Sequence, residues 1–149
     1  MSGQSSCEGP SEEPGSGPAS ESPPWDWRDL DQASLQAAWH DLAVWVEWLR
    51  RSYREWVSLP DCWPEHESLR SELCAFRWWH HRAQHTDGDP EDLIRWHGEL
   101  RHAAEAWGRL ATCEHGAPDA APVGTDEAAR RQRVSHHLRT AMGSRRPVV

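Results

Sequence analysis

Two short motifs in the chain combine cysteine with histidine, the residue types that most often bind zinc in structural sites. Cys62 and His66 form a C-x3-H motif, and Cys113 and His115 form a C-x-H motif further along. If the helix after the first motif and the helix before the second run antiparallel, both motifs lie at the same end of the fold. A Cys2His2 zinc site is then topologically feasible, although the paired spacings of zinc fingers are absent. The alternative is that the two cysteines are small buried apolar groups and that His66 caps or packs.

Signatures of other chemistries are missing from the sequence. No G-x-S-x-G nucleophile motif occurs, and a G-x-x-x-x-G-K phosphate loop is impossible because the chain has no lysine. His81 and His85 have the i, i+4 spacing that places two side chains on one helix face, but no third ligand is apparent beside them. We therefore expect a protein that is not an enzyme and holds no cofactor, with bound zinc as the alternative.

The C-terminal segment is the basic part of an otherwise acidic chain. Residues 126–149 contain six arginines and two acidic residues, whereas the whole chain has a formal net charge of −8. The candidates for contacts with nucleic-acid phosphates are Arg130, Arg131, Arg133 and Arg139. No DNA-binding motif is recognisable, and the acidic remainder would repel a polyanion. The alternative is a solvated tail, or one that docks on the acidic part of its own chain or of a second copy.

Tryptophan occurs eleven times, far more often than phenylalanine or tyrosine. Some of these tryptophans recur with other apolar residues at helical spacing, which predicts core positions: Trp39, Trp45, Trp96 and Trp107. Trp48 and Trp78 do not lie on the apolar helix faces that this spacing defines. Tryptophan is enriched in the hot spots of binding surfaces. They are candidates for a surface that binds a protein partner, either another protein or a second copy in a homodimer.

Apolar residues three and four positions apart predict three helices in the middle of the chain. The first begins near Asp31 and ends at Pro60, and the second begins at Pro64. The third begins at Asp89-Pro90, an N-cap followed by proline, and ends before Gly116. Because these helices are long and their connections short, we predict an all-α fold built on a three-helix antiparallel bundle.

The domain organisation follows from changes in composition along the chain. Residues 1–24 are predicted to be a disordered acidic tail, since they offer almost no apolar surface to bury. The bundle spans residues 25–115, a linker spans 116–124, and a weaker basic helix and tail span 125–149. No apolar run approaches the ~18 residues that cross a membrane, and no secretory signal is recognisable. We expect a cytoplasmic protein without a membrane partner.

The segment from about residue 35 to 115 also resembles a known group of proteins. The resemblance is carried by the runs W-V-E-W-L at 45–49, L-P-x-C-W-x-x-H-x-x-L-x-x-E-L at 59–73 and W-H-x-E-L at 96–100. It is similar to small helical actinobacterial proteins encoded on conjugative plasmids and integrative elements, whose members often end in a cysteine followed shortly by a histidine. That group has no assigned activity, so the resemblance implies a helical fold and a role in the maintenance or transfer of a mobile element.

These observations favour a non-enzymatic interaction or accessory protein. The alternatives are a small zinc-binding protein that uses the two Cys/His motifs, and a nucleic-acid accessory factor that uses the C-terminal arginines.

Overall fold

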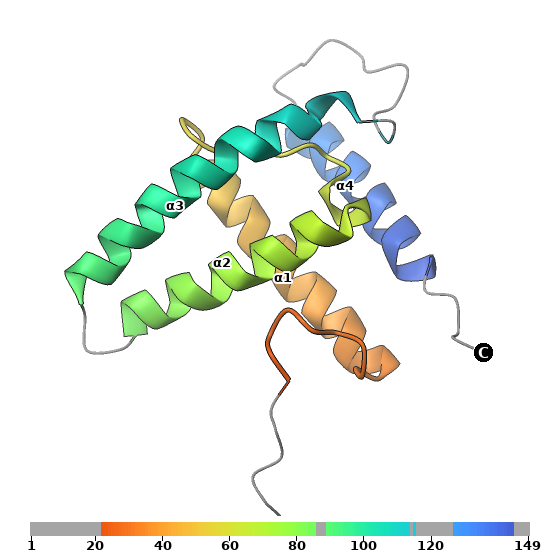
Figure 1. Ribbon diagram of the computed structural model, residues 1–149. Helices are drawn as coiled ribbons and strands as arrows, with labels where there is room; N and C mark the ends of the chain where they lie inside the picture. The colour runs from red at the N-terminus through yellow and green to blue at the C-terminus, as the bar shows by residue number, and fades with distance from the viewer. Residues whose placement is uncertain (1–21, 86–88, 114, 116–126, 145–149) are drawn as a thin grey trace, which may run out of the picture.

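A computed structural model describes residues 22–85, 89–113, 115 and 127–144 of the chain. In this part of the molecule four α-helices and two short 3-10 helices are joined by turns and loops, without any strand (Figure 1). The all-α class predicted from the sequence is confirmed. The predicted N-terminal tail lies outside the described residues up to position 21, and the predicted linker 116–124 lies entirely outside them. None of the described helices combines the length and the apolar character needed to cross a membrane.

Helix α1 spans Gln32–Ser52 and ends earlier than the sequence predicts. Of the two possible N-caps in the sequence, Asp31 and Ser34, Asp31 caps the helix, and its carboxylate accepts the backbone N–H of Ser34 at 2.7 Å. It does not continue to Pro60, because the backbone of Tyr53 leaves the helical conformation, with φ −121° and ψ 31°. A turn follows, in which the carbonyl of Tyr53 accepts the backbone N–H groups of Trp56 and Val57. Trp56, which the helical pattern places on the apolar face, is therefore 37% exposed.

The second predicted helix is divided into two elements. A 3-10 helix, η1, spans Trp63–Glu65, and helix α2 spans Glu67–His85. The sequence predicts Pro64 in the first turn of the second helix. Pro64 lies instead in η1, before α2 begins. Helix α3 spans Pro90–Gly108 and begins as predicted, since the side chain of Asp89 accepts the backbone N–H of Glu91 at 2.9 Å. It continues into a second 3-10 helix, η2, over Arg109–Thr112.

Helices α2 and α3 form an antiparallel hairpin, and α1 crosses α2 instead of running alongside both helices (Figure 1). Helix α4 spans Glu127–Gly143 and packs against η1. It lies at the open end of the hairpin that α2 and α3 form (Figure 1). The predicted weaker helix is therefore part of the folded body. It docks through Val134, which is 5% exposed, and through the half-buried Leu138 and Met142.

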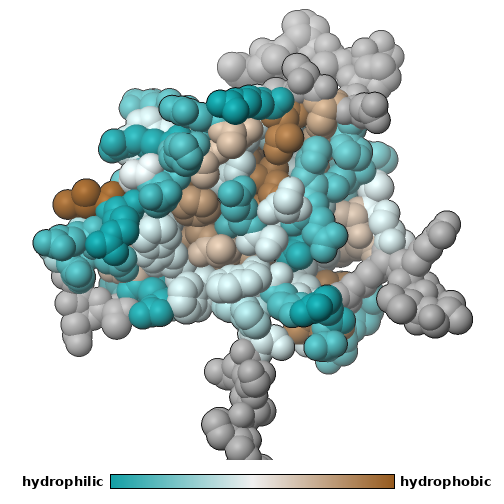
Figure 2. All heavy atoms as spheres, in the orientation of Figure 1, coloured by the Kyte–Doolittle hydropathy of each residue, from teal (hydrophilic) through white to brown (hydrophobic). Residues whose placement is uncertain are grey.

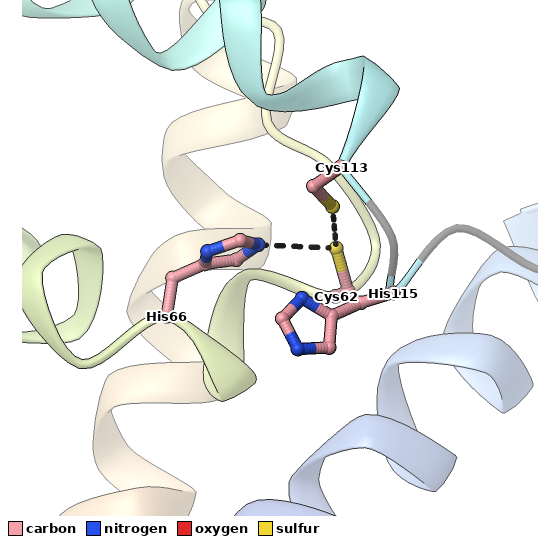
Figure 3. A group of neighbouring side chains, drawn as sticks. All are labelled: Cys62, His66, Cys113 and His115. Atoms are coloured by element: carbon pink, nitrogen blue, oxygen red, sulfur yellow. Dashed lines mark hydrogen bonds between the residues drawn. The ribbon is translucent and has the colours of Figure 1, made fainter.

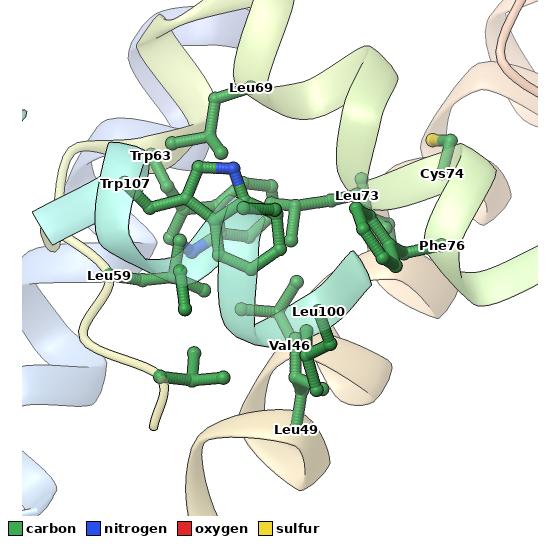
Figure 4. Close-up of a cluster of buried hydrophobic side chains, with 14 of the residues drawn as sticks. Val46, Leu49, Leu59, Trp63, Leu69, Leu73, Cys74, Phe76, Leu100 and Trp107 are labelled. Carbon is green, nitrogen blue, oxygen red and sulfur yellow. The ribbon is translucent and has the colours of Figure 1, made fainter. Parts of the chain in front are cut away.

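The core lies where the first three helices and the η1 connector meet (Figure 4). The apolar spacing of the predicted helices also indicates burial of Leu42, Trp45, Leu73, Leu100 and Trp107. Four of these five residues are at most 1% exposed: Leu42, Leu73, Leu100 and Trp107. The fifth, Trp45, is only partly buried, because the α1 stripe follows Leu42, Val46 and Leu49. Hydrophilic residues cover most of the face in Figure 2, and apolar atoms are visible between α2 and α3.

Candidate metal centre

The first Cys/His motif lies on the connector that joins α1 to α2. The Cys62 carbonyl accepts the backbone N–H of Glu65 at 2.9 Å, which forms η1 and brings the chain through one tight turn to His66. Trp63, between them, is completely buried and packs 6.2 Å from the ring of Trp39. The core therefore anchors the turn, and the side chains of Cys62 and His66 lie at its edge.

The second motif follows η2, where the chain leaves the body. Cys113 is the residue that caps η2, and its backbone N–H is donated to the carbonyl of Leu110 at 3.1 Å. Its backbone is extended, with φ −69° and ψ 158°, so the chain changes direction here and returns toward the connector. His115 follows two residues later and is exposed.

The four side chains meet in one cluster, as the antiparallel order of α2 and α3 predicts (Figure 3). The Sγ atom of Cys62 lies 3.1 Å from the Sγ atom of Cys113 and 3.5 Å from Nε2 of His66. The imidazole rings of His66 and His115 have their centroids 4.8 Å apart. One donor atom from each of the four residues lies within 4.8 Å of all the others, and in the described part of the chain this is the one such group of His, Cys and acidic residues.

The surroundings of the cluster favour its uncharged state in the absence of a metal. Burial and the neighbouring thiol of Cys113 raise the pKa of Cys62 to about 12. Burial, followed by the nearby His115, lowers the pKa of His66. A divalent cation that binds here must displace the thiol protons, as at any cysteine metal site. The remaining described cysteine, Cys74, is buried on α2 outside the cluster.

Two residues beside the cluster are not among the candidates that the sequence suggests. Glu65 approaches His115, with Oε2 4.0 Å from Nε2, and its other oxygen is hydrogen-bonded to Nδ1 of His137 on α4. From the sequence, an acidic residue such as Glu65 near the start of a helix indicates no more than a favourable charge there. His137 could have been found from its spacing, because it lies three residues after the buried Val134 and so shares its face of α4.

Three of the four candidate nucleic-acid arginines are paired with acidic residues of the same chain. Arg130 donates to Glu47 at 3.1 Å and Arg133 donates to Asp61 at 2.7 Å. Arg131 donates to Glu127, on its own helix, at 2.6 Å. Arg139 is exposed. These contacts favour the alternative in which the basic segment docks on the acidic part of its own chain.

The two candidate partner-surface tryptophans are exposed, Trp48 by 37% and Trp78 by 40%. They line one broad groove between α1 and α2 together with Trp25, whose ring meets that of Trp78 edge-on. Trp27, the neighbour of Trp25, is buried against Trp39.

The histidine pair His81 and His85 also lies together, with ring centroids 4.3 Å apart on the exposed face of α2. It is not part of a larger ligand group among the described residues.

Comparisons of the chain with protein-family models, with curated proteins and with solved structures find no match.

Proposed function

We propose that the protein binds one zinc ion through Cys62, His66, Cys113 and His115, and that this ion is structural. The observation that carries the proposal is the convergence of four donor atoms within 4.8 Å of one another from two separate parts of the chain. Two sulfur and two nitrogen donors in a tetrahedral arrangement are characteristic of zinc.

The spacing of the donor atoms supports this set of ligands. With Zn–S distances of ~2.3 Å and Zn–N distances of ~2.0–2.1 Å, neighbouring donors in a tetrahedron are about 3.3–3.8 Å apart. The two sulfurs are 3.1 Å apart, and Sγ of Cys62 is 3.5 Å from Nε2 of His66. Adjustments of under about 1 Å would thus complete the coordination, which side-chain rotations can supply.

The number of ligands favours a structural role over a catalytic one. Catalytic zinc sites keep one coordination position open for water or substrate, whereas four protein ligands close the shell. A closed centre would fasten the connector, through Cys62 and His66, to the end of η2, through Cys113. Binding energy at such a centre adds directly to folding free energy. This accords with the expectation that the protein is not an enzyme.

The test is zinc stoichiometry and affinity in the purified, reduced protein. We expect one zinc per chain by native mass spectrometry, and the strong thiolate-to-metal absorption of a tetrahedral site when cobalt replaces zinc. The variants C62S and C113S should lose both signals. C74S is the matched control, because Cys74 is also buried but lies outside the cluster. Absence of zinc from the wild type after reconstitution, or equal binding by C62S, would overturn the proposal.

We also propose, as a second function, that the protein is an accessory protein that binds a protein partner, in line with its resemblance to the proteins of mobile elements. The supporting observation is the groove between α1 and α2, where Trp25, Trp48 and Trp78 are each at least 37% exposed. A second copy is the partner that can be tested directly. Sedimentation velocity over a concentration series should show a dimer that W48A and W78A weaken. A wild-type monomer at every concentration would contradict self-association.

A further inference from the structure

Glu65 lies between two histidines that come from different elements. Its Oε2 atom is 4.0 Å from Nε2 of His115, and its Oε1 atom is hydrogen-bonded to Nδ1 of His137 on α4. The side chain of Glu65 is 17% exposed and that of His137 is 13% exposed, so this contact is largely shielded from water. Glu65 belongs to η1, the same short turn that separates Cys62 from His66.

The position of Glu65, 4.0 Å from Nε2, favours the other nitrogen of His115 as the one that binds a metal. Because Nε2 faces the carboxylate, Nδ1 is the ring nitrogen that remains for a cation. Figure 3 shows one ring nitrogen of His115 on the side of the Cys62 sulfur and the other pointing away from it. Metal-binding histidines commonly donate their second N–H to a carboxylate, which fixes both the tautomer and the orientation of the ring.

His137 in turn holds Glu65 from the other side. Its Nδ1–H occupies one carboxylate oxygen, which leaves the second oxygen for His115. Helix α4 is kept at this position by independent contacts, namely the buried Val134 and the ion pair between Arg133 and Asp61. The chain of contacts therefore runs from α4 through Glu65 to a member of the metal cluster.

We propose that Glu65 is the positioning residue of the zinc centre and that His137 holds it in place, so that α4 completes the centre. This inference rests on the proposed function, because a positioning role requires a metal. Two imidazole N–H groups need two accepting oxygens, and a carboxylate supplies both. A favourable charge at the start of a helix would not require this paired arrangement, since that interaction has no directional partner.

The test compares zinc affinity among matched variants by competition with a chromophoric chelator. Glu65→Gln keeps the size of the side chain but leaves one accepting oxygen. We expect it to weaken zinc binding about 10–100-fold, the usual effect of losing such a partner. Glu67→Gln is the control, because Glu67 is an exposed acid two residues away. His137→Phe keeps the ring but removes the donor, and we expect a loss of about tenfold. Its control is His136→Phe, at the exposed neighbouring position.

A second measurement separates positioning from a general structural role. Urea unfolding of each variant in the presence of a chelator reports the stability of the metal-free fold, and we expect E65Q to lose less there than in the presence of zinc. The cobalt form of E65Q should also show shifted absorption bands, because the ring of His115 is no longer held.

The outcomes distinguish the two proposals. If the wild type binds no zinc, both are overturned. If the wild type binds zinc and E65Q binds it within about twofold, only the role of Glu65 is overturned. If E65Q weakens binding but H137F matches H136F, the part assigned to α4 is wrong. Equal losses for E65Q with and without zinc would also overturn the positioning role.

Discussion

Individual tryptophans in this small protein differ greatly in what they contribute to stability. The Trp107 side chain is 1% exposed, its ring lies 5.5 Å from that of Phe76, and its Nε1–H donates to Glu72 at 2.9 Å. Trp45, on α1, is only partly buried. We expect W107A to lower the free energy of unfolding by about 3–5 kcal/mol, and W45A by clearly less. Chemical denaturation measures both. If W107A and W45A lowered the free energy of unfolding by similar amounts, the exposed fraction of a tryptophan would not indicate its contribution to stability.

His80 is the residue whose titration should be visible in the stability of the fold. Its ring lies 4.5 Å from that of Trp96 and 4.8 Å from that of Trp48. Burial, followed by the neighbouring His97, lowers its pKa below the ordinary value of 6.5. The unfolded chain then binds this proton more readily than the folded one. The stabilisation is therefore complete above about pH 6.5 and is lost as the pH falls toward the folded-state pKa.

The corresponding experiment measures the free energy of unfolding from about pH 7 to about pH 5, with a chelator present to remove any metal contribution. We expect a shallower decline for H80Q than for the wild type, while H102Q, at an exposed position on α3, keeps the wild-type slope. His66, whose pKa is also lowered, contributes equally to the wild type and both variants. Identical slopes for H80Q and the wild type would rule out His80 as the source.

Among the elements, the connector after α1 depends on one buried arginine. Arg50 is 7% exposed, and its Nη2 donates to the carbonyls of Leu59 at 2.6 Å and Pro60 at 3.2 Å. Its Nη1 reaches Asp61 at 3.4 Å. We expect R50K to cost about 2–3 kcal/mol in unfolding free energy, because a lysine ammonium cannot satisfy these separated acceptors together. R51K, at an exposed position, should stay within about 0.5 kcal/mol of the wild type. An equally small cost for R50K would refute this assignment.

The helix boundaries differ in how far they depend on local residues, which decides whether the sequence predicts them. The start of α3 is predicted correctly because Asp89 and Pro90 act locally, through a cap and a preset backbone angle. The end of α1 is not, because the backbone leaves the helical conformation at Tyr53 and Arg50 then holds the connector through the distant carbonyls of Leu59 and Pro60. No residue type near Ser52 signals a stop. Pro60 is the first local signal, and the helix ends before it.

The candidate metal centre likewise has a part that the sequence predicts and a part that depends on distant contacts. The meeting of Cys62 with Cys113 needs only the directions of α2 and α3, which the apolar spacing and the turn between them supply. The places of Glu65 and His137 need the docking of α4, whose apolar pattern is sparse. Val134 is its one buried residue, with Leu138 and Met142 half-buried. The four donors can therefore be predicted from the sequence. Of the two residues that support them, only His137 carries a sequence signal, its spacing from Val134 on α4.

At the scale of the whole molecule, the opposite charges of the C-terminal helix and the middle of the chain have a structural consequence. The basic helix α4 lies against α1 and the connector, with Arg130 paired to Glu47 of α1 and Arg133 paired to Asp61 of the connector. Both pairs are partly exposed to solvent, so each contributes under about 1 kcal/mol. These ion pairs mainly fix the orientation of α4, and the burial of Val134 mainly stabilises its packing against the rest of the fold. Arginines engaged in this way are less available to a polyanion.

A zinc ion would stabilise the fold further, because it would join the connector after α1 to the segment that follows η2. The described chain is small, and the stability of a domain of this size is marginal. We expect zinc at a hundred times its dissociation constant to raise the free energy of unfolding by about 2.7 kcal/mol, less any binding to cysteines of the unfolded chain. Thermal unfolding of the wild type should shift upward with the logarithm of zinc concentration and return to the metal-free value after chelation. C74S should follow the wild type, and C113S should show no shift. A rise of equal size in C113S would place the ion elsewhere, because Cys113 supplies the one described sulfur that meets Cys62 across the fold.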